Sequence, residues 1–314
     1  MRAAVGLTDA QLGTPWAWHE YDEEGLRFAL LMAHQELRDL TATIADERAR
    51  TGPPLTIAQR ILGQYHDAYR DLTGALAGLR DDELDREPAP GEWPVRSAIQ
   101  HMLGAESGFR TSMVLAVRLR RAGERRSATD DERKALNVPE QVGGDRGAVL
   151  DGLFRSHVRI LRELSDVRDE EVGTPSEFWE DTRYPVRFRL HRLEEHMRQH
   201  TVQVDKTLAG IGHPPSEAER LARLVYQAVG GLEAAQIGAP GIASAAQKRS
   251  AAVIAGLAGS VETGAATASA PRRGIIAWGQ GPSARASSST RRPATRPAPP
   301  RRSAVTVAAV SPTV

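Results

Sequence analysis

The sequence predicts an all-α protein built on an antiparallel four-helix bundle, and three observations carry this prediction. Apolar residues recur at alternating steps of three and four, which is typical of one face of an α-helix. Segments rich in Pro and Gly separate these stretches, and the four middle stretches have the length of bundle helices. No segment alternates between polar and apolar residues for more than a few positions, so we expect no extended strand.

The first long helix is expected within an N-terminal helical extension, residues 1–55. Its apolar residues lie on one face of a helix that covers about residues 20–48. These residues are Leu26, Leu30, Ala33, Leu37, Leu40 and Ile44. The sequence Thr51-Gly-Pro-Pro then ends the helix, because Gly and Pro are poor helix residues.

Two bundle helices follow, each with a recognisable start. Thr56 and Gln59 have capping-box spacing and open the first of them. The sequence Glu87-Pro-Ala-Pro-Gly interrupts the chain, and Trp93-Pro94 opens the second helix, with Pro expected at the first helical position. This helix is expected to end near Gly123. Residues 120–144 are charged and contain Pro and Gly, which predicts a long loop.

The last two bundle helices complete a domain over residues 56–211. One of them is predicted from an apolar face formed by Leu150, Leu153, Phe154, Leu161 and Leu164. The other begins near Pro185 and ends at about Gly210. A second capping box, Ser216 with Glu219, opens a further helix, so residues 212–262 are expected to form a C-terminal helical extension.

Composition divides the chain into an acidic body and a basic tail. Of the 41 basic and 40 acidic residues, ten Lys or Arg residues and a single acid, Glu262, lie in residues 236–314. Residues 263–314 consist mainly of Ala, Ser, Thr, Pro, Arg and Gly, and they are predicted to be disordered because they have little apolar surface to bury. The same composition would result from a reading-frame slip in GC-rich DNA. Nucleic-acid binding by this tail is a weak alternative, since Trp278 is its only aromatic residue.

The absence of Cys excludes disulfides, thiolate metal sites and a protein thiol nucleophile. The N-terminus has no apolar run typical of a signal peptide, and the longest apolar stretch is too short to span a membrane. We therefore expect a cytoplasmic protein with no membrane partner.

Two histidines in the last bundle helix point to a divalent metal. His196 follows Leu193 by three positions and His200 precedes Val204 by four, so both lie in the apolar stripe of the helix. They are four residues apart, and both imidazoles can reach one point. Neutral imidazole is a common ligand of Zn, Ni, Fe and Cu. Two core histidines that bond to other polar groups would produce the same pattern.

A third ligand would have to come from a facing helix, and two histidines fit. His101 lies at the edge of the apolar stripe of the second bundle helix, and His157 lies in register with Leu153 and Leu161 of the third. The residues alone leave this choice open. The other five histidines are expected to be solvated or packed side chains, namely His19, His34, His66, His191 and His213.

Residues 56–211 resemble the DinB-like family. An acidic turn, a Pro/Gly break, Trp93 opening a helix and His101 eight residues later are similar to the approach to that family's second bundle helix. The sequence Glu195-His196-Met197-Arg198-Gln199-His200 is similar to its H-x3-H motif in the last helix. The two motifs occur in the family's order. The resemblance implies a four-helix bundle in which His101, His196 and His200 hold a divalent metal, and it leaves His157 as a core residue.

The resemblance also suggests a function. Some members of the family are transferases or isomerases that use a small thiol such as mycothiol, and a chain without Cys fits a thiol that arrives as cosubstrate. The expected cofactor is Zn, Ni, Fe or Mn, which would activate a small thiol or water for attack on an electrophile. The expected partner is a small-molecule substrate. Glu106, Glu195 and Gln203 are polar candidates near the ligands, although none is assigned as catalytic. The alternative is a non-catalytic metal-binding stress-response protein that acts as a helical homodimer.

Overall fold

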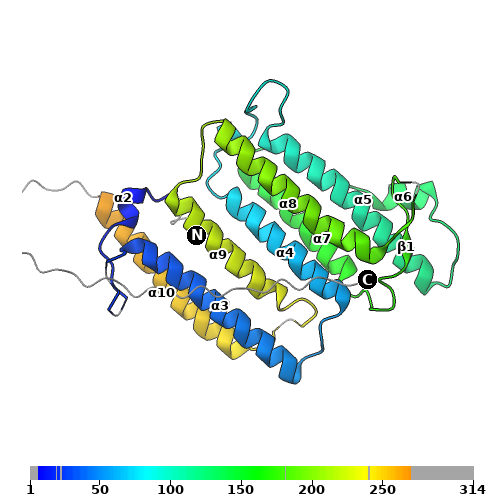
Figure 1. The fold of residues 1–314 in the computed structure, drawn as a ribbon, viewed down its shortest axis with the longest axis horizontal. Helices are drawn as coiled ribbons and strands as arrows, with labels where there is room; N and C mark the ends of the chain where they lie inside the picture. The colour runs from blue at the N-terminus through cyan, green and yellow to red at the C-terminus, as the bar shows by residue number, and fades with distance from the viewer. Residues whose placement is uncertain (1–5, 19, 22, 181, 240, 270–314) are drawn as a thin grey trace, which may run out of the picture. The chain divides into compact units, whose positions relative to one another are not determined.

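A computed structural model describes residues 6–18, 20–21, 23–180, 182–239 and 241–269 of the 314-residue chain. In these residues almost all the regular secondary structure is helical (Figure 1). The two short strands, β1 (Pro175–Ser176) and β2 (Tyr184–Pro185), pair antiparallel just before the last bundle helix. The prediction of an all-α protein is therefore confirmed.

The centre of the fold is a bundle of four helices. They are α4 (Ile57–Ala75), α5 (Val95–Arg121), α7 (Arg146–Leu164) and α8 (Val186–Gly210). Helix α8 packs against both α4 and α5, and α7 packs against the same two helices. One hydrophobic core joins all four, with Leu62, Met102, Ile160 and Leu190 each fully buried. These helices carry every predicted metal ligand.

Hydrogen bonds at the helix starts explain where the bundle helices begin. The predicted capping box at α4 is present, because the Thr56 hydroxyl accepts from the Gln59 backbone N–H while the Gln59 side chain accepts from the Thr56 N–H. Asp145 caps α7 through a single bond, in which its carboxylate accepts from the Ala148 N–H. Pro94 has extended backbone angles and is the N-cap of α5, so the expectation that it is the first helical residue was wrong by one position.

The predicted loop over residues 120–144 contains a helix, α6 (Asp130–Leu136). A third capping box, formed by Thr129 and Glu132, starts it. None of its residues is buried, so the sequence has no apolar stripe there that would reveal a helix. The prediction of a loop was wrong at this point because local capping determines the structure.

The buried face of α7 differs from the predicted one. Phe154 is 53% exposed, although the sequence analysis placed it on the apolar face. The face that enters the core contains Val149, Leu153, His157 and Ile160. A buried histidine takes a position where an apolar residue was expected, and this shifts the face by about one residue around the helix.

The extension helices form a second layer beside the bundle. They are α3 (Leu26–Thr51), α9 (Glu217–Ala234) and α10 (Ser244–Ser269). Helix α9 packs along α4, α3 packs along α9, and α10 packs along α3. A separate apolar core that includes Leu30, Leu37 and Val225 joins these helices with the short α2 (Asp9–Leu12). The described residues through Ser269 belong to one compact unit.

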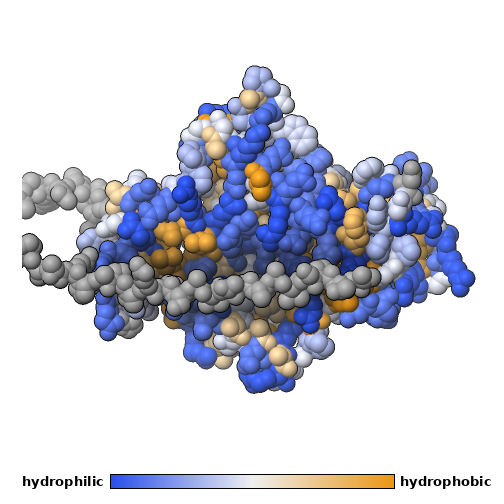
Figure 2. Space-filling view, viewed as in Figure 1, coloured by the Kyte–Doolittle hydropathy of each residue, from blue (hydrophilic) through white to orange (hydrophobic). Residues whose placement is uncertain are grey.

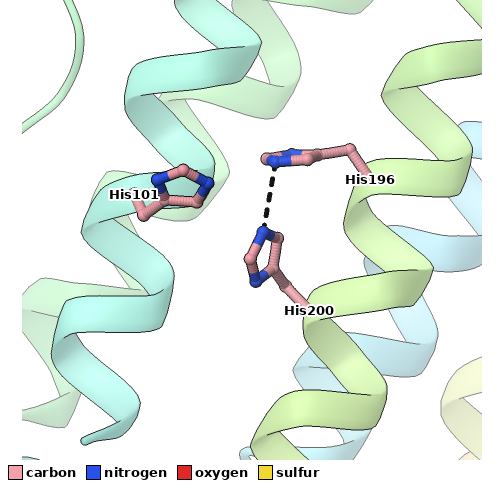
Figure 3. A group of neighbouring side chains, drawn as sticks. All are labelled: His101, His196 and His200. Carbon is pink, nitrogen blue, oxygen red and sulfur yellow. Dashed lines mark hydrogen bonds between the residues drawn. The ribbon is translucent and has the colours of Figure 1, made fainter. Parts of the chain in front are cut away.

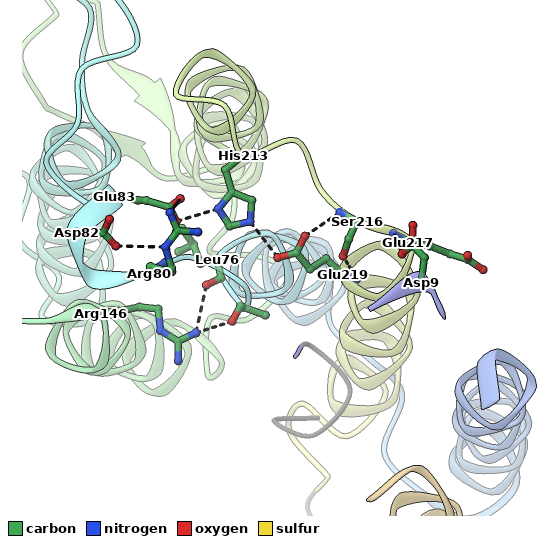
Figure 4. A network of polar contacts seen from close by, with 11 residues as sticks. Asp9, Leu76, Arg80, Asp82, Glu83, Arg146, His213, Ser216, Glu217 and Glu219 are labelled. Atoms are coloured by element: carbon green, nitrogen blue, oxygen red, sulfur yellow. Dashed lines mark hydrogen bonds and ion pairs between the residues drawn. The ribbon is translucent and has the colours of Figure 1, made fainter. Parts of the chain in front are cut away.

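A histidine connects this second layer to the bundle (Figure 4). His213, in the turn between α8 and α9, contacts the Glu83 carboxylate at 2.8 Å and the Glu219 carboxylate at 3.0 Å. Glu83 ends the 3-10 helix η1 (Asp81–Glu83), and Glu219 belongs to the capping box that opens α9. Burial lowers the pKa of His213, but the two hydrogen bonds outweigh burial and the pKa is raised overall.

Hydrophilic side chains cover most of the face shown in Figure 2. Among the described residues, we find no helix that is long and apolar enough to cross a membrane. Helix α10 continues to Ser269, beyond residue 263, where the sequence analysis placed the start of a disordered tail. The rest of that predicted tail, residues 270–314, lies outside the described residues.

Candidate metal centre

The structure brings together His101, His196 and His200 (Figure 3). His101 comes from α5, whereas His196 and His200 are one turn apart on α8. One nitrogen atom from each imidazole lies within 4.8 Å of the other two. The rings face a common point between the two helices, as Figure 3 shows. This is the arrangement that the sequence analysis expected of a three-histidine site.

The two histidines of α8 meet through the nitrogen atoms that a metal would use. The Nε2 atoms of His196 and His200 are 3.1 Å apart, a separation at which only one of them can carry a proton. Two nitrogen ligands of a tetrahedral zinc ion lie about 3.4 Å apart, given bonds of about 2.0–2.1 Å. The pair therefore fits a shared divalent ion without a large movement of either ring.

Burial favours the neutral form of the two imidazoles on α8. His196 is 6% exposed and His200 is 5% exposed, whereas His101 is open to solvent. Burial, together with the smaller effects of the neighbouring His200 and His101, lowers the pKa of His196 to about 3. Burial also lowers the pKa of His200, against a smaller opposing effect of its hydrogen bond to Gln203. Neutral nitrogens with free lone pairs are the form in which histidine binds metals.

Gln203 determines the orientation of His200. Its Oε1 atom accepts a hydrogen bond of 2.8 Å from Nδ1 of His200, which places the proton on Nδ1 and leaves the Nε2 lone pair directed at the site. His196 has no equivalent, because its buried Nδ1 atom has no protein partner within the described ranges. Of the three polar candidates from the sequence, Gln203 is the one that contacts a predicted ligand.

The other two candidates lie in different surroundings. Glu195 is exposed and pairs with Arg192 at 3.0 Å, so it belongs to the solvated face of α8. Glu106 is almost completely buried, and its Oε2 atom accepts a hydrogen bond of 2.9 Å from the hydroxyl of Tyr65. Burial raises the pKa of Glu106 to about 8, against the smaller lowering effect of that hydrogen bond. Glu106 is therefore protonated at neutral pH.

An open hollow of about 420 Å³ adjoins the three-histidine cluster. His101 and His200 line it from opposite helices, together with Gln203 and Trp93. The Trp93 ring lies 5.0 Å from the His101 ring, between centroids. Lys206 and Glu92, which also line the hollow, form an ion pair of 3.1 Å. Small molecules from solvent can therefore reach two of the three imidazoles.

His157, the rival third ligand, lies in a separate cluster of the core. It is 2% exposed and stacks on the Tyr69 ring at 4.0 Å between centroids. Its Nε2 atom contacts Nδ1 of His66 at 2.8 Å, and Nε2 of His66 contacts the Glu233 carboxylate at 2.7 Å. The roles of His66 and Glu233 could not be found from the sequence, because Glu233 comes from α9, far along the chain.

Comparison with known families agrees with the geometry of the bundle. Residues 64–204 match the model of the DinB superfamily. These residues are a DinB superfamily domain. The match begins within α4 and ends within α8, so all three clustered histidines lie inside the DinB-like domain. Neither curated proteins nor solved structures give a match to this chain.

Proposed function

We propose that the DinB-like domain is a metal-dependent enzyme that activates a small thiol, such as a mycothiol-type cosubstrate, or water for attack on an electrophile. One observation supports this more than any other. His101, His196 and His200 converge from two helices, and the hollow of about 420 Å³ opens onto two of them. A purely structural metal site would instead have all its coordination positions filled by protein.

The donor set suits a catalytic ion. A divalent metal held by three neutral imidazoles keeps its full positive charge, and it would lower the pKa of a bound thiol or water. The residues around the site contribute by holding the ligand imidazoles in the orientation and protonation state that a metal requires. Gln203 holds His200 in one tautomer, and burial of His196 and His200 keeps both neutral. Trp93 forms an apolar wall beside His101, where the carbon skeleton of a substrate can pack.

The polar residues that line the hollow favour a substrate with both neutral polar groups and charged groups. Gln199, Gln203 and Thr207 offer neutral hydrogen-bonding groups, and the Lys206–Glu92 pair offers both signs of charge. Because the chain has no Cys, a thiol nucleophile would have to come from the cosubstrate. The proposal therefore requires two small molecules, a thiol or water and an electrophile, to meet at this hollow.

Elemental analysis of the purified, untagged protein tests the proposal. We expect about one Zn, Ni, Fe or Mn per chain, lost in a His196→Ala/His200→Ala variant. A His34→Ala/His191→Ala variant is the matched control, since it removes two histidines outside the cluster and should keep the metal. Turnover of thiol plus electrophile by the loaded protein, absent in the first variant, would then support catalysis. A protein that binds none of these ions would overturn the proposal.

A second candidate is a non-catalytic metal-binding stress-response protein that acts as a homodimer. This alternative rests on the same histidine cluster, since a site that holds a metal need not turn over a substrate. Light scattering coupled to gel filtration distinguishes the candidates when combined with the turnover assay. A metal-loaded dimer without turnover for any thiol or hydrolytic substrate would favour this second function.

A further inference from the structure

The strongest remaining feature is a basic hollow at the far end of α5 from the predicted metal ligands. We name it the arginine basin, and it has a volume of about 470 Å³. Five guanidinium groups line it, from Arg120, Arg125, Arg126, Arg133 and Arg183. The lining includes two carboxylates, Glu124 and Glu177. Arg126 pairs with Glu124 and Glu132, and Arg133 pairs with Asp130 as well as with Glu177. Arg120 and Arg125 are the lining arginines without a carboxylate partner among the described residues, and unpaired positive charge in a hollow attracts anions.

The arginines come from separate parts of the chain. Arg120 lies in the last turn of α5, where a cation also complements the helix dipole. Arg133 lies on α6, and Arg183 precedes β2. The fold therefore brings together arginines from several elements. The basic residues that are common at the end of a single helix would not account for all of them.

Two of the arginines are held in place by one carboxylate. Glu177 contacts Arg133 at 2.7 Å and Arg183 at 2.6 Å, and it accepts a hydrogen bond of 2.7 Å from Ser127. Two oxygen atoms cannot use all the N–H donors of two guanidinium groups. Arg133 also donates to Asp130 at 3.0 Å, and Arg183 also donates to Ser127 at 2.9 Å. Glu177 therefore fixes both side chains, and each guanidinium group keeps only part of its donors for a ligand.

Two further arginines have no carboxylate partner among the described residues. Arg120 donates to the Thr174 hydroxyl at 3.1 Å and makes no ion pair there, and Arg125 makes none either. Both side chains belong to exposed residues at the rim of the basin. Free guanidinium groups bind phosphate through two parallel N–H bonds, a geometry in which arginine is more effective than lysine.

An inner branch of about 270 Å³ shares Ser112, Arg133 and Glu177 with the basin. The Phe178 ring forms one wall, and Gly108 allows its close approach to α5, since a Cβ atom there would lie 2.2 Å from the ring. Thr111 also lines the branch; it is 4% exposed, and its hydroxyl has no hydrogen-bond partner among the described residues. A buried, unpaired hydroxyl beside a hollow can be satisfied by a ligand.

We propose that the arginine basin binds a small organic phosphate, with the phosphate group among the arginines and the organic group against Phe178 in the inner branch. The volume is within the range of small-molecule sites. This site is separate from the proposed metal centre, because Ser112 follows His101 by eleven residues, about 16 Å along α5. The proposal does not depend on the proposed function of the DinB-like domain.

Isothermal titration of the full chain with phenyl phosphate, in the presence of EDTA, tests this proposal. We expect saturable binding at one site, tighter than that of inorganic phosphate because the ring contacts Phe178. An Arg120→Gln/Arg125→Gln variant should weaken binding by at least about tenfold, since each hydrogen bond to a charged group contributes that much or more. The variant should fold normally because neither side chain is buried or paired with a carboxylate.

The matched control is Arg162→Gln/Arg220→Gln, which removes the same charge from exposed positions on α7 and α9. Equal weakening in both variants would overturn the proposal, because it would show a general charge effect. Absence of saturable binding would also overturn it. Benzoate binding as tightly as phenyl phosphate would reject the phosphate as the recognised group. Binding of single-stranded DNA without binding of phenyl phosphate would indicate a polyanion surface instead.

Discussion

Two pairs of histidines in the same bundle core show how differently a fold can treat a buried imidazole. His66 and His157 contact each other at 2.8 Å, and Glu233 and the Tyr69 ring enclose them. His196 and His200 contact each other at 3.1 Å, but a hollow opens onto His200 and an exposed third histidine, His101. In the first pair, three of the four ring nitrogens have protein partners, and only Nδ1 of His157 has none among the described residues. In the second pair, the two Nε2 atoms have only each other as partners, at a place that solvent can reach through the hollow.

The difference lies in the partners and not in the histidines. His66 donates to a carboxylate that Arg70 holds with two contacts of 2.6 Å, so its network ends in a neutral ion pair. Nδ1 of His200 bonds to the neutral amide of Gln203, and Nε2 of His200 points at the imidazole of His196. A cation is the simplest group that satisfies two such lone pairs together. This comparison separates a structural histidine pair from a candidate metal site.

The largest effect is expected from a substitution in the enclosed pair, His66 and His157. His157→Ala removes a fully buried, stacked ring and leaves Nδ1 of His66 without its partner, so we expect it to destabilise the protein by about 3 kcal/mol. Urea denaturation measures this loss. Metal content per folded chain should not change. Loss of the metal with little loss of stability would reverse the roles of the two pairs.

Removal of a bound metal should lower the stability of the protein only where the second pair, His196 and His200, is intact. At a metal concentration about 100 times Kd, the loaded protein should be about 2.7 kcal/mol more stable than the chelated protein. We expect this difference to vanish in His196→Ala and to persist in His191→Ala, which lies outside the cluster on the same helix. Thermal unfolding with and without EDTA makes the measurement. Equal stabilisation of both variants would place the metal elsewhere.

A substitution at Gln203, next to the predicted metal ligands, tests how much the orientation of His200 contributes to metal binding. Gln203→Leu removes the acceptor that orients His200, and we expect metal affinity to fall about tenfold while the fold is retained. Competition with a chromophoric chelator reports the affinity. Glu195→Gln is the control, because its exposed side chain faces solvent on the same helix. An affinity that is unchanged in Gln203→Leu would show that His200 needs no orienting partner.

The smallest expected effect concerns His213, a histidine that binds two carboxylates and no imidazole. Its pKa is raised in the folded state, so its contribution to stability is complete below the unfolded value of about 6.5 and is lost as pH rises through the folded pKa. The pKa values of Glu83 and Glu219 are lowered despite burial, so their contribution fades in acid. We therefore expect His213→Gln to destabilise the protein by about 1 kcal/mol near pH 6.

The difference between wild type and His213→Gln should shrink as pH rises above 6 through the raised pKa of His213, beyond which the wild-type histidine is neutral. Urea titrations near pH 6 and at a clearly alkaline pH provide the test. A difference that grows with pH would contradict the sign of the predicted linkage and would show that Glu83 and Glu219 do not stabilise the charged form.

The bundle could be predicted because its signals are local and periodic. The stripes of α4, α5 and α8 and the capping boxes at Thr56 and Ser216 can be found from the sequence alone, and all are present. Helix α6 was missed because it buries nothing, and Phe154 was misplaced because His157 occupies the buried face. Periodicity identifies apolar faces, and it fails where a polar residue enters the core.

The histidine cluster was predictable for a related reason and with a definite limit. The H-x3-H spacing places two imidazoles on one face, but nothing local distinguishes His101 from His157 as the third, and only the family resemblance favoured His101. The role of Gln203 follows from its position one turn after His200. The partner of His66 is on α9, 167 residues further along the chain, and no spacing rule connects the two.

The position of α4 has a consequence for how this protein can be shortened. An outer helix of an isolated bundle has one face in water, yet α4 packs against α8 on one side and against α9 on the other. Gly74 lies so close to α9 that a Cβ atom there would be 3.1 Å from Tyr226, and the same close packing recurs where Gly230 meets Arg70. A chain cut at the end of α8 would expose a surface shaped for another helix and leave His66 without its carboxylate. The minimal unit that folds well should therefore include α9, which lies beyond the residues of the family match.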